Sequence, residues 1–344
     1  MNDQINVGII GAGRIGAVHA QNLATRISGA HIVAISDIRR EAAERCAAAW
    51  GIPQAYADPE LVLTHPDIHA VLICSSTDTH AALTMQAAAA GKHVFCEKPI
   101  DLNLARIEET LTAVKAAGVK FMVGFNRRFD HNFRRVHDLV RAGSIGTPHL
   151  LHIISRDPAP PPPAYVRISG GIFLDMTIHD FDMARYLIGS EVVEVFVTGG
   201  VMVDPAIGKA GDIDTALTVL RFENGTIGTI DNSRQAVYGY DQRVEVFGSG
   251  GAVRADNDFP NTVTMNDATS IRRDLPLSFF MDRYTESYVA ELQAFITCVE
   301  TDDEPPVGGE DGRYATLMAY AARRSYSENR PVRVEEVTQD NATS

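Results

Sequence analysis

The sequence predicts an α/β protein with a doubly wound parallel sheet, followed by an α+β domain with an open, largely antiparallel sheet. Three observations lead to this prediction. Short apolar runs alternate with helical patterns as far as Gly124, a glycine-rich turn follows the first apolar run, and strand-like alternation dominates after Gly189. A length of 344 residues fits two domains better than one. We place these domains at residues 1–124 and 125–344.

The overall charge limits the classes of partner. The formal net charge is −13, with 45% hydrophobic and 22% charged residues. Nucleic acids and anionic membranes both select a basic surface, so neither is expected as a partner. A polyanionic substrate is disfavoured for the same reason. A small neutral molecule fits this balance best.

The cysteines and the apolar runs indicate the compartment. Cys46, Cys74, Cys96 and Cys298 form no C-x-x-C pair, and two of them lie in strand-like runs. This distribution is typical of buried thiols in a reducing compartment. No apolar run approaches the roughly 18 residues that a membrane span needs, and no cleavable leader is evident. We therefore expect a cytoplasmic protein.

A G-x-G-x-x-G motif at Gly11–Gly16 follows the strand-like run Ile5–Ile10 and opens a helical pattern. The next strand, His31–Asp37, ends in an acid about 20 residues after Gly16. This is the context of a dinucleotide-binding Rossmann turn. The alternative is a tight turn without a ligand. The residues assigned to the cofactor here are Gly11, Gly13, Arg14, Ile15, Gly16 and Asp37.

The chemistry of these residues favours NAD. Glycines let the backbone approach a pyrophosphate, which the amino terminus of the following helix stabilises through its N–H groups. Asp37 can accept hydrogen bonds from ribose hydroxyls and would repel the 2′-phosphate of NADP. Arg39 and Arg40 weaken this preference, because an arginine there could accept a phosphate.

Three further helices and strands, ending in the strand 120–124, extend the predicted parallel sheet to Gly124. Ligands of such sheets bind beyond the carboxyl ends of the strands. We therefore assign Ser75, Thr77, His80, Glu97 and Lys98 to the cofactor site, although His80 fits equally well as an ordinary residue in the first turn of a helix. Lys98 precedes Pro99, so a cis peptide that directs its side chain is plausible. The alternative is a surface lysine.

The second candidate site is a polar stripe on an apolar helix. The spacing predicts a helix at Gly170–Gly189, in which Asp175, His179 and Asp182 lie at i, i+4 and i+7 on one face. Buried polar groups cost free energy unless they are paired or used. The alternative is an Asp–His pair that only satisfies itself.

The rest of the second half alternates like strands of one antiparallel sheet. The prolines of 157–163 predict a rigid loop near the pocket, with Tyr165 either lining the pocket or packing beside it. Asn224-Gly225 predicts a hairpin, and we expect a disordered tail from Thr338. The remaining predicted elements are helices at 132–142, 286–300 and 311–327, and strands at 149–156, 191–200, 213–222, 226–236, 243–247 and 332–337.

Gly11–Gly16, Glu97-Lys98-Pro99 and Asp175-x-x-x-His179 together resemble the glucose–fructose oxidoreductase/inositol dehydrogenase (Gfo/Idh/MocA) family over essentially the whole chain. The resemblance implies oxidation of a secondary hydroxyl of a cyclic polyol, with NAD as hydride acceptor. Myo-inositol or scyllo-inositol, oxidised to the inosose, is the expected substrate. It also implies a homotetramer or a dimer that packs sheet to sheet. The stretches that resemble inositol-oxidising members are 124–130, 155–158, 175–182 and 238–241.

The family resemblance also implies roles for single residues. It assigns catalysis to Lys98, Asp175 and His179, with His179 as the base. This agrees with the chemistry, because imidazole titrates near neutral pH and a lysine can stabilise negative charge on the reacting oxygen. The sequence departs from some inositol enzymes at Ser155 and Asp157. The residues expected to bind substrate are Lys98, Arg127, Asp157, Asp175, His179, Asp182 and Tyr240.

Three alternatives remain at this point. One is a pyranose 1-dehydrogenase acting on a glucose-like sugar. Another is a nicotinamide-binding sensor without turnover, which would not need Lys98, Asp175 and His179 together. The third is a metal hydrolase, but the stripe holds only one histidine and supplies a tetrahedral site poorly. We therefore expect no metal.

Overall fold

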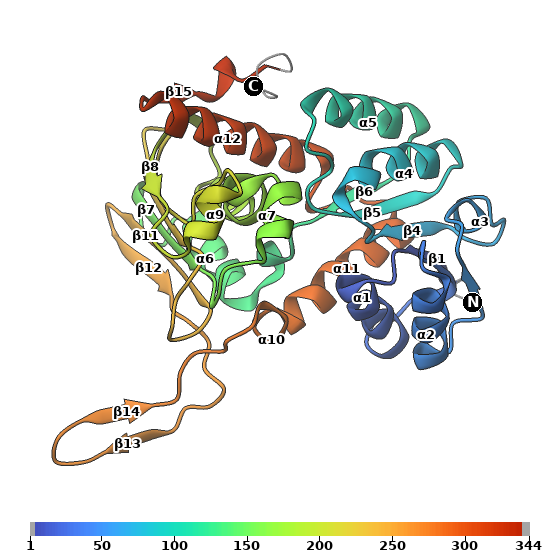
Figure 1. Cartoon of the computed structure of the whole chain (residues 1–344), viewed down its shortest axis with the longest axis horizontal. Coiled ribbons are helices and arrows are strands. Elements are labelled where there is room, and N and C mark those ends of the chain that lie inside the picture. Colours follow the sequence, from blue (N-terminus) through green and yellow to red (C-terminus); the bar gives the residue numbers. More distant parts are fainter. Residues whose placement is uncertain (1–3, 339–344) are drawn as a thin grey trace. The chain divides into compact units, whose positions relative to one another are not determined.

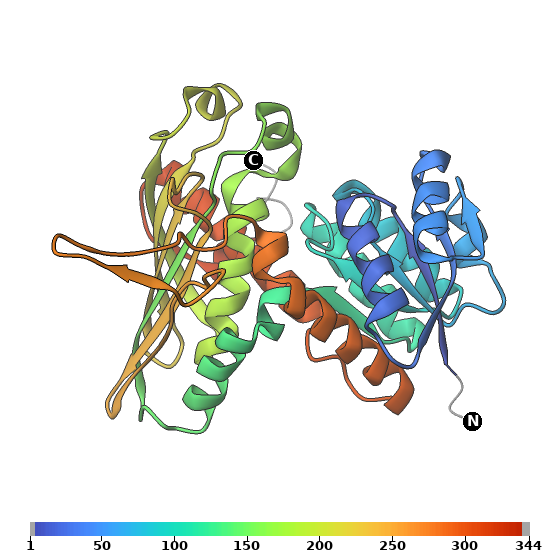
Figure 2. The ribbon, with the colours of Figure 1, turned by 90° about the horizontal axis from the view of Figure 1, so that it is seen from below.

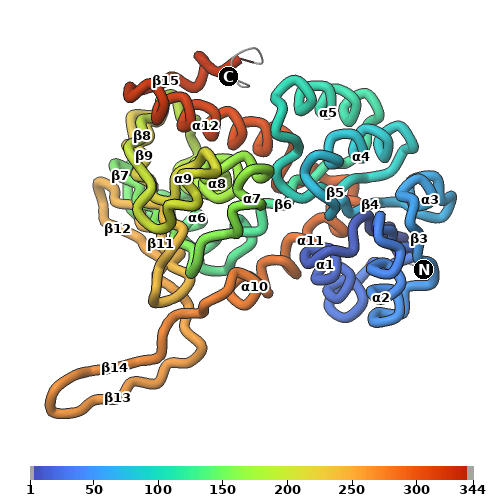
Figure 3. The backbone as a smooth tube through the Cα atoms, in the orientation of Figure 1, coloured from blue at the N-terminus to red at the C-terminus, as the bar shows by residue number. Residues whose placement is uncertain are grey.

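The computed structural model describes residues 4–338 and divides them into two compact units. The first unit comprises residues 4–129 and 286–316, and the second comprises residues 130–285 and 317–338. The chain therefore leaves the first unit and later returns to it, a path that can be followed in Figure 3. A functional boundary between residues 124 and 125 stays a prediction.

The first unit contains a six-stranded, entirely parallel sheet in the order β3-β2-β1-β4-β5-β6 (Figure 1). This confirms the predicted doubly wound fold, and the order reverses between β1 and β4, where ligands of such sheets bind. Every residue of the central strand β4 and of the edge strand β6 is buried. The short β3 was not predicted. The strands are β1 (Ile5–Ile10), β2 (Ala30–Ser36), β3 (Gln54–Tyr56), β4 (Ala70–Ile73), β5 (His93–Glu97) and β6 (Phe121–Gly124).

Helices complete the first unit, and local sequence explains where several begin and end. The side chain of Asn103 accepts hydrogen bonds from the first backbone N–H groups of α5, and Gly118, at φ 66°, ends that helix. The four-residue α3 was not predicted. The helices are α1 (Arg14–Thr25), α2 (Arg40–Trp50), α3 (Glu60–Leu63), α4 (Thr77–Ala89), α5 (Leu104–Ala117), η1 (Asn126–Phe129), most of α11 (Thr285–Thr301) and the first part of α12 (Gly309–Glu328).

The second unit is built on a seven-stranded sheet in the order β12-β11-β7-β10-β9-β8-β15. The hairpin predicted at Asn224-Gly225 joins β9 to β10, which pair antiparallel. The sheet is mixed, because β10 and β7 run parallel while the other pairs are antiparallel. The strands are β7 (Pro148–Arg156), β8 (Val192–Gly200), β9 (Thr215–Phe222), β10 (Ile227–Ser233), β11 (Asp241–Gly248), β12 (Gly251–Ala255) and β15 (Val332–Arg333).

Two helices, α6 (His131–Arg141) and α8 (Ile178–Ile188), lie along one face of this sheet (Figure 2). The proline-rich segment, predicted to be a loop, leads into a helix, α7 (Pro163–Ser169). Proline is tolerated at the first helical position because its missing N–H would have no partner there. The smaller helices of this unit are η2 (Phe173–Thr177), α9 (Pro205–Lys209) and α10 (Phe280–Arg283).

The opposite face of the same sheet carries exposed apolar side chains. Leu150 lies directly beside both Ile227 and Phe247 in the ladder, and the three are 37%, 47% and 45% exposed. Leu217 and Val219 extend the row along β9, at 45% and 36% exposure. These five residues lie on one face of the sheet, which we call the open sheet face; Arg221 lies beside Ile227 and Thr229 beside Val219 on the same face.

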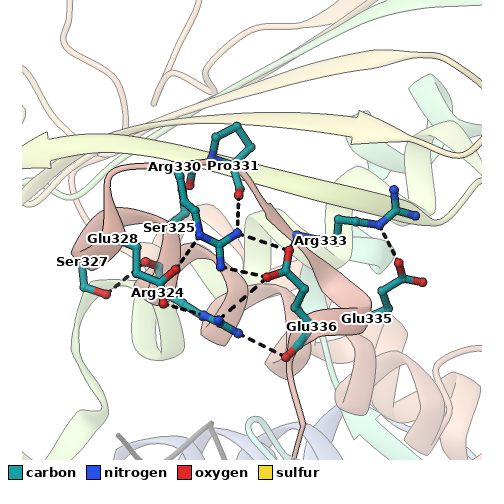
Figure 4. A network of polar contacts seen from close by, with 9 residues as sticks. All are labelled: Arg324, Ser325, Ser327, Glu328, Arg330, Pro331, Arg333, Glu335 and Glu336. Atoms are coloured by element: carbon teal, nitrogen blue, oxygen red, sulfur yellow. Dashed lines mark hydrogen bonds and ion pairs between the residues drawn. The ribbon is translucent and has the colours of Figure 1, made fainter.

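Two features near the end of the second unit were not predicted. A two-stranded arm, β13 (Thr264–Asn266) and β14 (Ile271–Arg273), extends from it (Figure 1). The strand predicted at 332–337 is shorter in the structure. Only Val332–Arg333 form β15, and the 3₁₀ turn η3 (Val334–Glu336) follows. Arg330 pairs with Glu328 and Glu336 around this turn (Figure 4), which holds the end of α12 beside it.

Three expectations concern the chain as a whole. All four cysteines are free and buried, as their sequence positions suggested. Within residues 4–338, no helix is both long enough and apolar enough to cross a membrane. The tail predicted to be disordered falls almost wholly outside the described residues.

Candidate functional site

The glycine turn has the backbone geometry of a pyrophosphate cradle. Gly11 has φ +103°, and a Cβ there would lie 2.6 Å from the backbone carbonyl of Cys74. A Cβ on Gly16 would lie 1.9 Å from the carbonyl oxygen of Gly11. Around Gly13, by contrast, a Cβ would meet nothing within 4 Å in the described part of the chain. Two glycines therefore permit the tight turn, and the third leaves open space at the start of α1, where a phosphate would approach.

Asp37 supports this turn directly. One carboxylate oxygen accepts the backbone N–H of Ala12 at 2.8 Å, and the other accepts the N–H of Arg39 at 2.8 Å. Each oxygen has two lone pairs, so acceptor capacity remains for ribose hydroxyls. The Arg39 guanidinium lies 3.6 Å from the same carboxylate. Asp37 thus combines a structural role with the position that the fingerprint predicts.

The segment after β4 contains three predicted cofactor residues. The hydroxyl of Ser75 is hydrogen-bonded to that of Thr79 at 2.6 Å, and Thr77 is the first residue of α4. His80 does not present a ring nitrogen to the cofactor. Its Nδ1 lies 2.8 Å from the carbonyl oxygen of Pro99, and its Nε2 lies 3.1 Å from that of Ser75.

Both partners of the His80 ring are carbonyl oxygens, so the imidazolium, with two N–H donors, fits this position. Burial alone would lower the pKa of His80, but Cys96 and the carbonyls of Pro99 and Ser75 raise it to about 9. The structure therefore gives His80 the role of holding the segment next to Lys98.

Glu97 and Lys98 lie at the carboxyl end of β5. The carboxylate of Glu97 is 2.7 Å from Nε2 of His19, and a Cβ on Gly124 would come within 3.0 Å of it. The Lys98–Pro99 peptide is cis, and Lys98 is half-buried. Arg127, in η1, is 5% exposed. The first unit thus brings the glycine turn, Asp37, Ser75, Glu97 and Lys98 to the carboxyl ends of β1, β2, β4 and β5, as predicted.

In the second unit, the predicted helix around His179 begins with a π-helical turn. η2 continues directly into α8, and the hydroxyl of Thr177 donates to the carbonyl of Ile172, five residues earlier, at 3.2 Å. Such turns often occur at functional sites. Asp175 and His179 are half-buried, whereas the residues between them are buried. The predicted stripe is therefore accessible at these two positions.

Asp175 is held by two side chains from other elements. Tyr165, in α7, donates its hydroxyl to one carboxylate oxygen at 3.0 Å. Arg234, just after β10, donates to the other at 3.0 Å and also lies 3.4 Å from Asp157. Burial first, and then the charge of Asp175, raise the pKa of the Tyr165 hydroxyl. Asp175 is thus oriented by one neutral donor and one cation.

Arg234 is the functional residue that sequence reasoning missed. Its side chain is 3% exposed, and it pairs with two residues that the sequence placed in the substrate site. Nε and Nη2 have no hydrogen-bond partner among residues 4–338. A buried arginine with unused donors is typical of a site that binds polar groups. In the sequence, Arg234 lies within the predicted strand 226–236, and nothing there marked it as part of the site.

The other predicted substrate residues differ in burial. Asp182 is 1% exposed, so it lies below the accessible face on which Asp175 and His179 stand. Tyr240 is 6% exposed and packs edge-on against Tyr284, with ring centroids 6.0 Å apart. Their binding roles stay predictions. Asp180, beside His179, has a structural partner, because Asn232 donates to its carboxylate at 2.8 Å.

Two family profiles account for most of the chain. Residues 5–125 match the Gfo/Idh/MocA oxidoreductase family with its NAD-binding Rossmann fold, and residues 133–254 match the C-terminal domain of that family. The chain belongs to the Gfo/Idh/MocA family. This confirms the resemblance predicted from Gly11–Gly16, Glu97–Pro99 and the Asp175–His179 helix. The glycine turn and Asp37 fit NAD, the cofactor of this family's Rossmann domain.

Several members of the Gfo/Idh/MocA family are similar to this chain over nearly its whole length. Myo-inositol 2-dehydrogenase from Thermotoga maritima is 53% identical over 97% of this chain and 99% of its own length. Inositol 2-dehydrogenase from Rhizobium meliloti is 46% identical over 96% and 99%, respectively. The crystal structure of scyllo-inositol dehydrogenase from Lactobacillus casei, with bound NAD(H) and scyllo-inositol, has a TM-score of 0.90 at 33% identity, covering 96% of this chain and 99% of that one.

Proposed function

We propose that this protein is an NAD-dependent inositol 2-dehydrogenase that oxidises myo-inositol, or its isomer scyllo-inositol, to the inosose. The observation that carries this proposal is the accessible pair Asp175 and His179, with Asp175 fixed by Tyr165 and Arg234. The inositol dehydrogenases reported above support the substrate class. The two relatives with higher identity are named for myo-inositol or for inositol, and the scyllo-inositol enzyme is less similar.

The residues divide the reaction between them. Oxidation of a secondary alcohol removes a hydride from carbon and a proton from oxygen, leaving a carbonyl group. NAD, when bound, supplies the hydride acceptor. His179 accepts the hydroxyl proton, because a neutral imidazole is a base suited to neutral pH. Lys98 donates a hydrogen bond to the same oxygen and stabilises its developing negative charge.

Asp175 and its neighbours provide recognition. An inositol ring carries only neutral hydroxyl groups, so its orientation depends on converging donors and acceptors. Asp175 and Asp157 accept hydrogen bonds from such hydroxyls, while the single positive charge of Arg234 lies against both carboxylates and offsets part of their charge. Arg127, Asp182 and Tyr240 complete the proposed substrate set.

The first test is NADH formation at 340 nm with myo-, scyllo- and chiro-inositol and with D- and L-glucose, each with NAD and with NADP. We expect turnover of one inositol with NAD and much weaker turnover with NADP, because Asp37 repels a 2′-phosphate. Turnover mainly of glucose would replace the proposal by a pyranose 1-dehydrogenase. Measured NAD binding without any turnover would identify a sensor.

We also propose that the protein is a homotetramer or a dimer joined through the open sheet face. Contiguous exposed apolar area is uncommon on a monomer, and the neighbours Leu150, Ile227 and Phe247 provide it on this sheet. A second copy of the same face is self-complementary under two-fold symmetry. Four buried free thiols also favour a reducing compartment, so we propose the cytoplasm.

This assembly predicts that Leu217→Glu with Ile227→Glu dissociates the oligomer, because four or more charges would face one another across a dry interface. Light scattering coupled to gel filtration measures the mass directly. Leu61→Glu is the matched control, since Leu61 is also exposed, at 49%, but lies in α3 of the first unit. A monomeric parent protein, or a double variant with unchanged mass, would exclude this interface.

A further inference from the structure

A cluster of ionisable side chains lies in the first unit. It includes Glu97, the residue that precedes Lys98. His19 from α1, Glu97 from β5 and Glu291 from α11 have ligand atoms within 4.8 Å of one another. His19 and Glu291 are both 0% exposed. Phe95 packs edge-on against the ring of His19, and so does Tyr288, with ring centroids at 5.4 and 5.8 Å. Aromatic side chains therefore flank the histidine of the cluster.

Glu291 is the unexplained member of this cluster. Neither of its carboxylate oxygens has a hydrogen-bond partner among the described residues. An ionised carboxylate in such a place would be costly, because a buried charge needs a cation or several donors. Burial, and then the charge of Glu97, raise the pKa of Glu291 well above its ordinary value. The other titratable groups around it are His19, Glu97, Cys96, Cys74 and Tyr288.

We propose that Glu291 is a positioning residue: it is held as a neutral carboxylic acid and donates a hydrogen bond to the carboxylate of Glu97. A protonated carboxyl group has one O–H donor, and Glu97 is the charged acceptor in the cluster. Nε2 of His19, in α1, lies 2.7 Å from a carboxylate oxygen of Glu97. Gly124, in β6, has no side chain to clash with the same carboxylate. Glu291 fixes it from a third element, α11.

The consequence concerns Lys98, the next residue in the chain. In this proposal, His19 and Glu291 hold the side chain of Glu97, and His80 holds the carbonyl of Pro99. Lys98 therefore stands between two anchored residues. A catalytic lysine must keep its ammonium group within hydrogen-bond distance of the reacting oxygen, so anchoring on both sides favours turnover. Glu291 acts on the reaction only through this chain of contacts.

The geometry favours a proton over a metal ion in this cluster. A tetrahedral zinc ion, with ligand bonds of about 2.0–2.2 Å, separates its ligand atoms by more than 3 Å. Nε2 of His19 and the carboxylate oxygen of Glu97 are only 2.7 Å apart, which is a direct hydrogen bond. Three side chains also leave a closed zinc site one ligand short.

Infrared difference spectroscopy of the full-length protein tests the protonation state. A protonated carboxyl group absorbs at a higher C=O stretching frequency than a carboxylate. At neutral pH, the spectrum of the parent minus that of Glu291→Gln should contain this acid band. Glu300→Gln is the matched control on the same helix, because Glu300 is exposed and its loss should remove only carboxylate bands. Absence of the acid band would overturn the proposal.

Turnover tests the positioning role. This readout rests on the proposed function, so it uses whichever substrate gives NADH. Glu291→Gln keeps an N–H donor and should retain kcat within about threefold, whereas Glu291→Leu should lower kcat about tenfold with unchanged NAD affinity, the effect of one hydrogen bond. Equal losses in the two variants would contradict the proposal. Stoichiometric metal in the parent protein, lost in Glu291→Gln, would assign the cluster to a cation.

The two readouts separate the possible failures. If no substrate is turned over, the infrared spectrum still decides whether Glu291 is protonated. If Glu291→Leu fails to fold, the spectrum and the kcat of Glu291→Gln remain. A normal acid band with equal kcat in both variants would mean that the neutral acid exists but does not position Glu97.

Discussion

Replacing His179 with alanine should lower kcat by about 10³-fold and leave NAD affinity unchanged, because general acid–base catalysis by one side chain is worth about 10²–10⁴-fold. His179 belongs to the second unit, whereas the glycine turn that binds NAD belongs to the first. Steady-state kinetics and fluorescence titration with NADH measure the two effects separately. Lys98→Ala should behave in the same way, because it removes the donor that we propose for the reacting oxygen.

His131→Ala is the control for His179, since His131 is exposed at the start of α6 and has no place in the proposed reaction. Its kcat should match that of the parent protein. A His179→Ala variant with nearly normal turnover at neutral pH would remove this residue from the role of base. A loss of NAD binding together with kcat would instead indicate that the substitution damages the fold.

The second large effect is expected at Arg234. Arg234→Leu removes the cation between Asp157 and Asp175 and leaves two carboxylates close together without their partner. Removing one member of a buried ion pair costs about 3–5 kcal/mol. We therefore expect a fall of about 3 kcal/mol in the free energy of unfolding, measured by urea denaturation, and a large loss of kcat because Asp175 loses its orientation.

A second substitution distinguishes charge from packing at this position. Adding Asp157→Asn to Arg234→Leu removes one of the two unpaired charges, so it should recover a substantial part of the lost stability. Arg234→Lys keeps the charge and should be less damaging than Arg234→Leu. If neither change improves stability, then the guanidinium group contributes by packing alone.

The sequence was most informative where one stretch of chain determines the structure. The strand, the turn at Gly11–Gly16 and the position of Asp37 follow from local patterns, and the structure confirms all of them. Asp175 and His179 were found because they share one helix. The π-helical turn between them was not foreseen, since it depends on how Thr177 and its neighbours pack against Asn232 of the sheet.

The missed features depend on contacts between distant parts of the chain. Arg234 meets Asp175 across 59 residues, and no local pattern marks an arginine after a strand as a ligand of that carboxylate. The parallel pairing of β10 with β7 also depends on contacts between segments that are far apart in the chain, so local patterns did not predict it. Glu291 lies in a predicted helix, but the sequence around it does not show that it contacts His19 and Glu97 in the core of the first unit.

The return of α11 to the first unit also affects how the protein is made. During synthesis, residues 4–129 leave the ribosome long before residues 286–316, which complete the same unit. Until then, Phe95 lacks the aromatic ring of Phe295 beside it. The backbone N–H of Val123 lacks its acceptor, the carbonyl of Val307, and Arg128 lacks its ion-pair partner Asp311. The cofactor-binding unit therefore reaches its final packing only near the end of translation, so a fragment cut after Gly124 would expose apolar core surface to water.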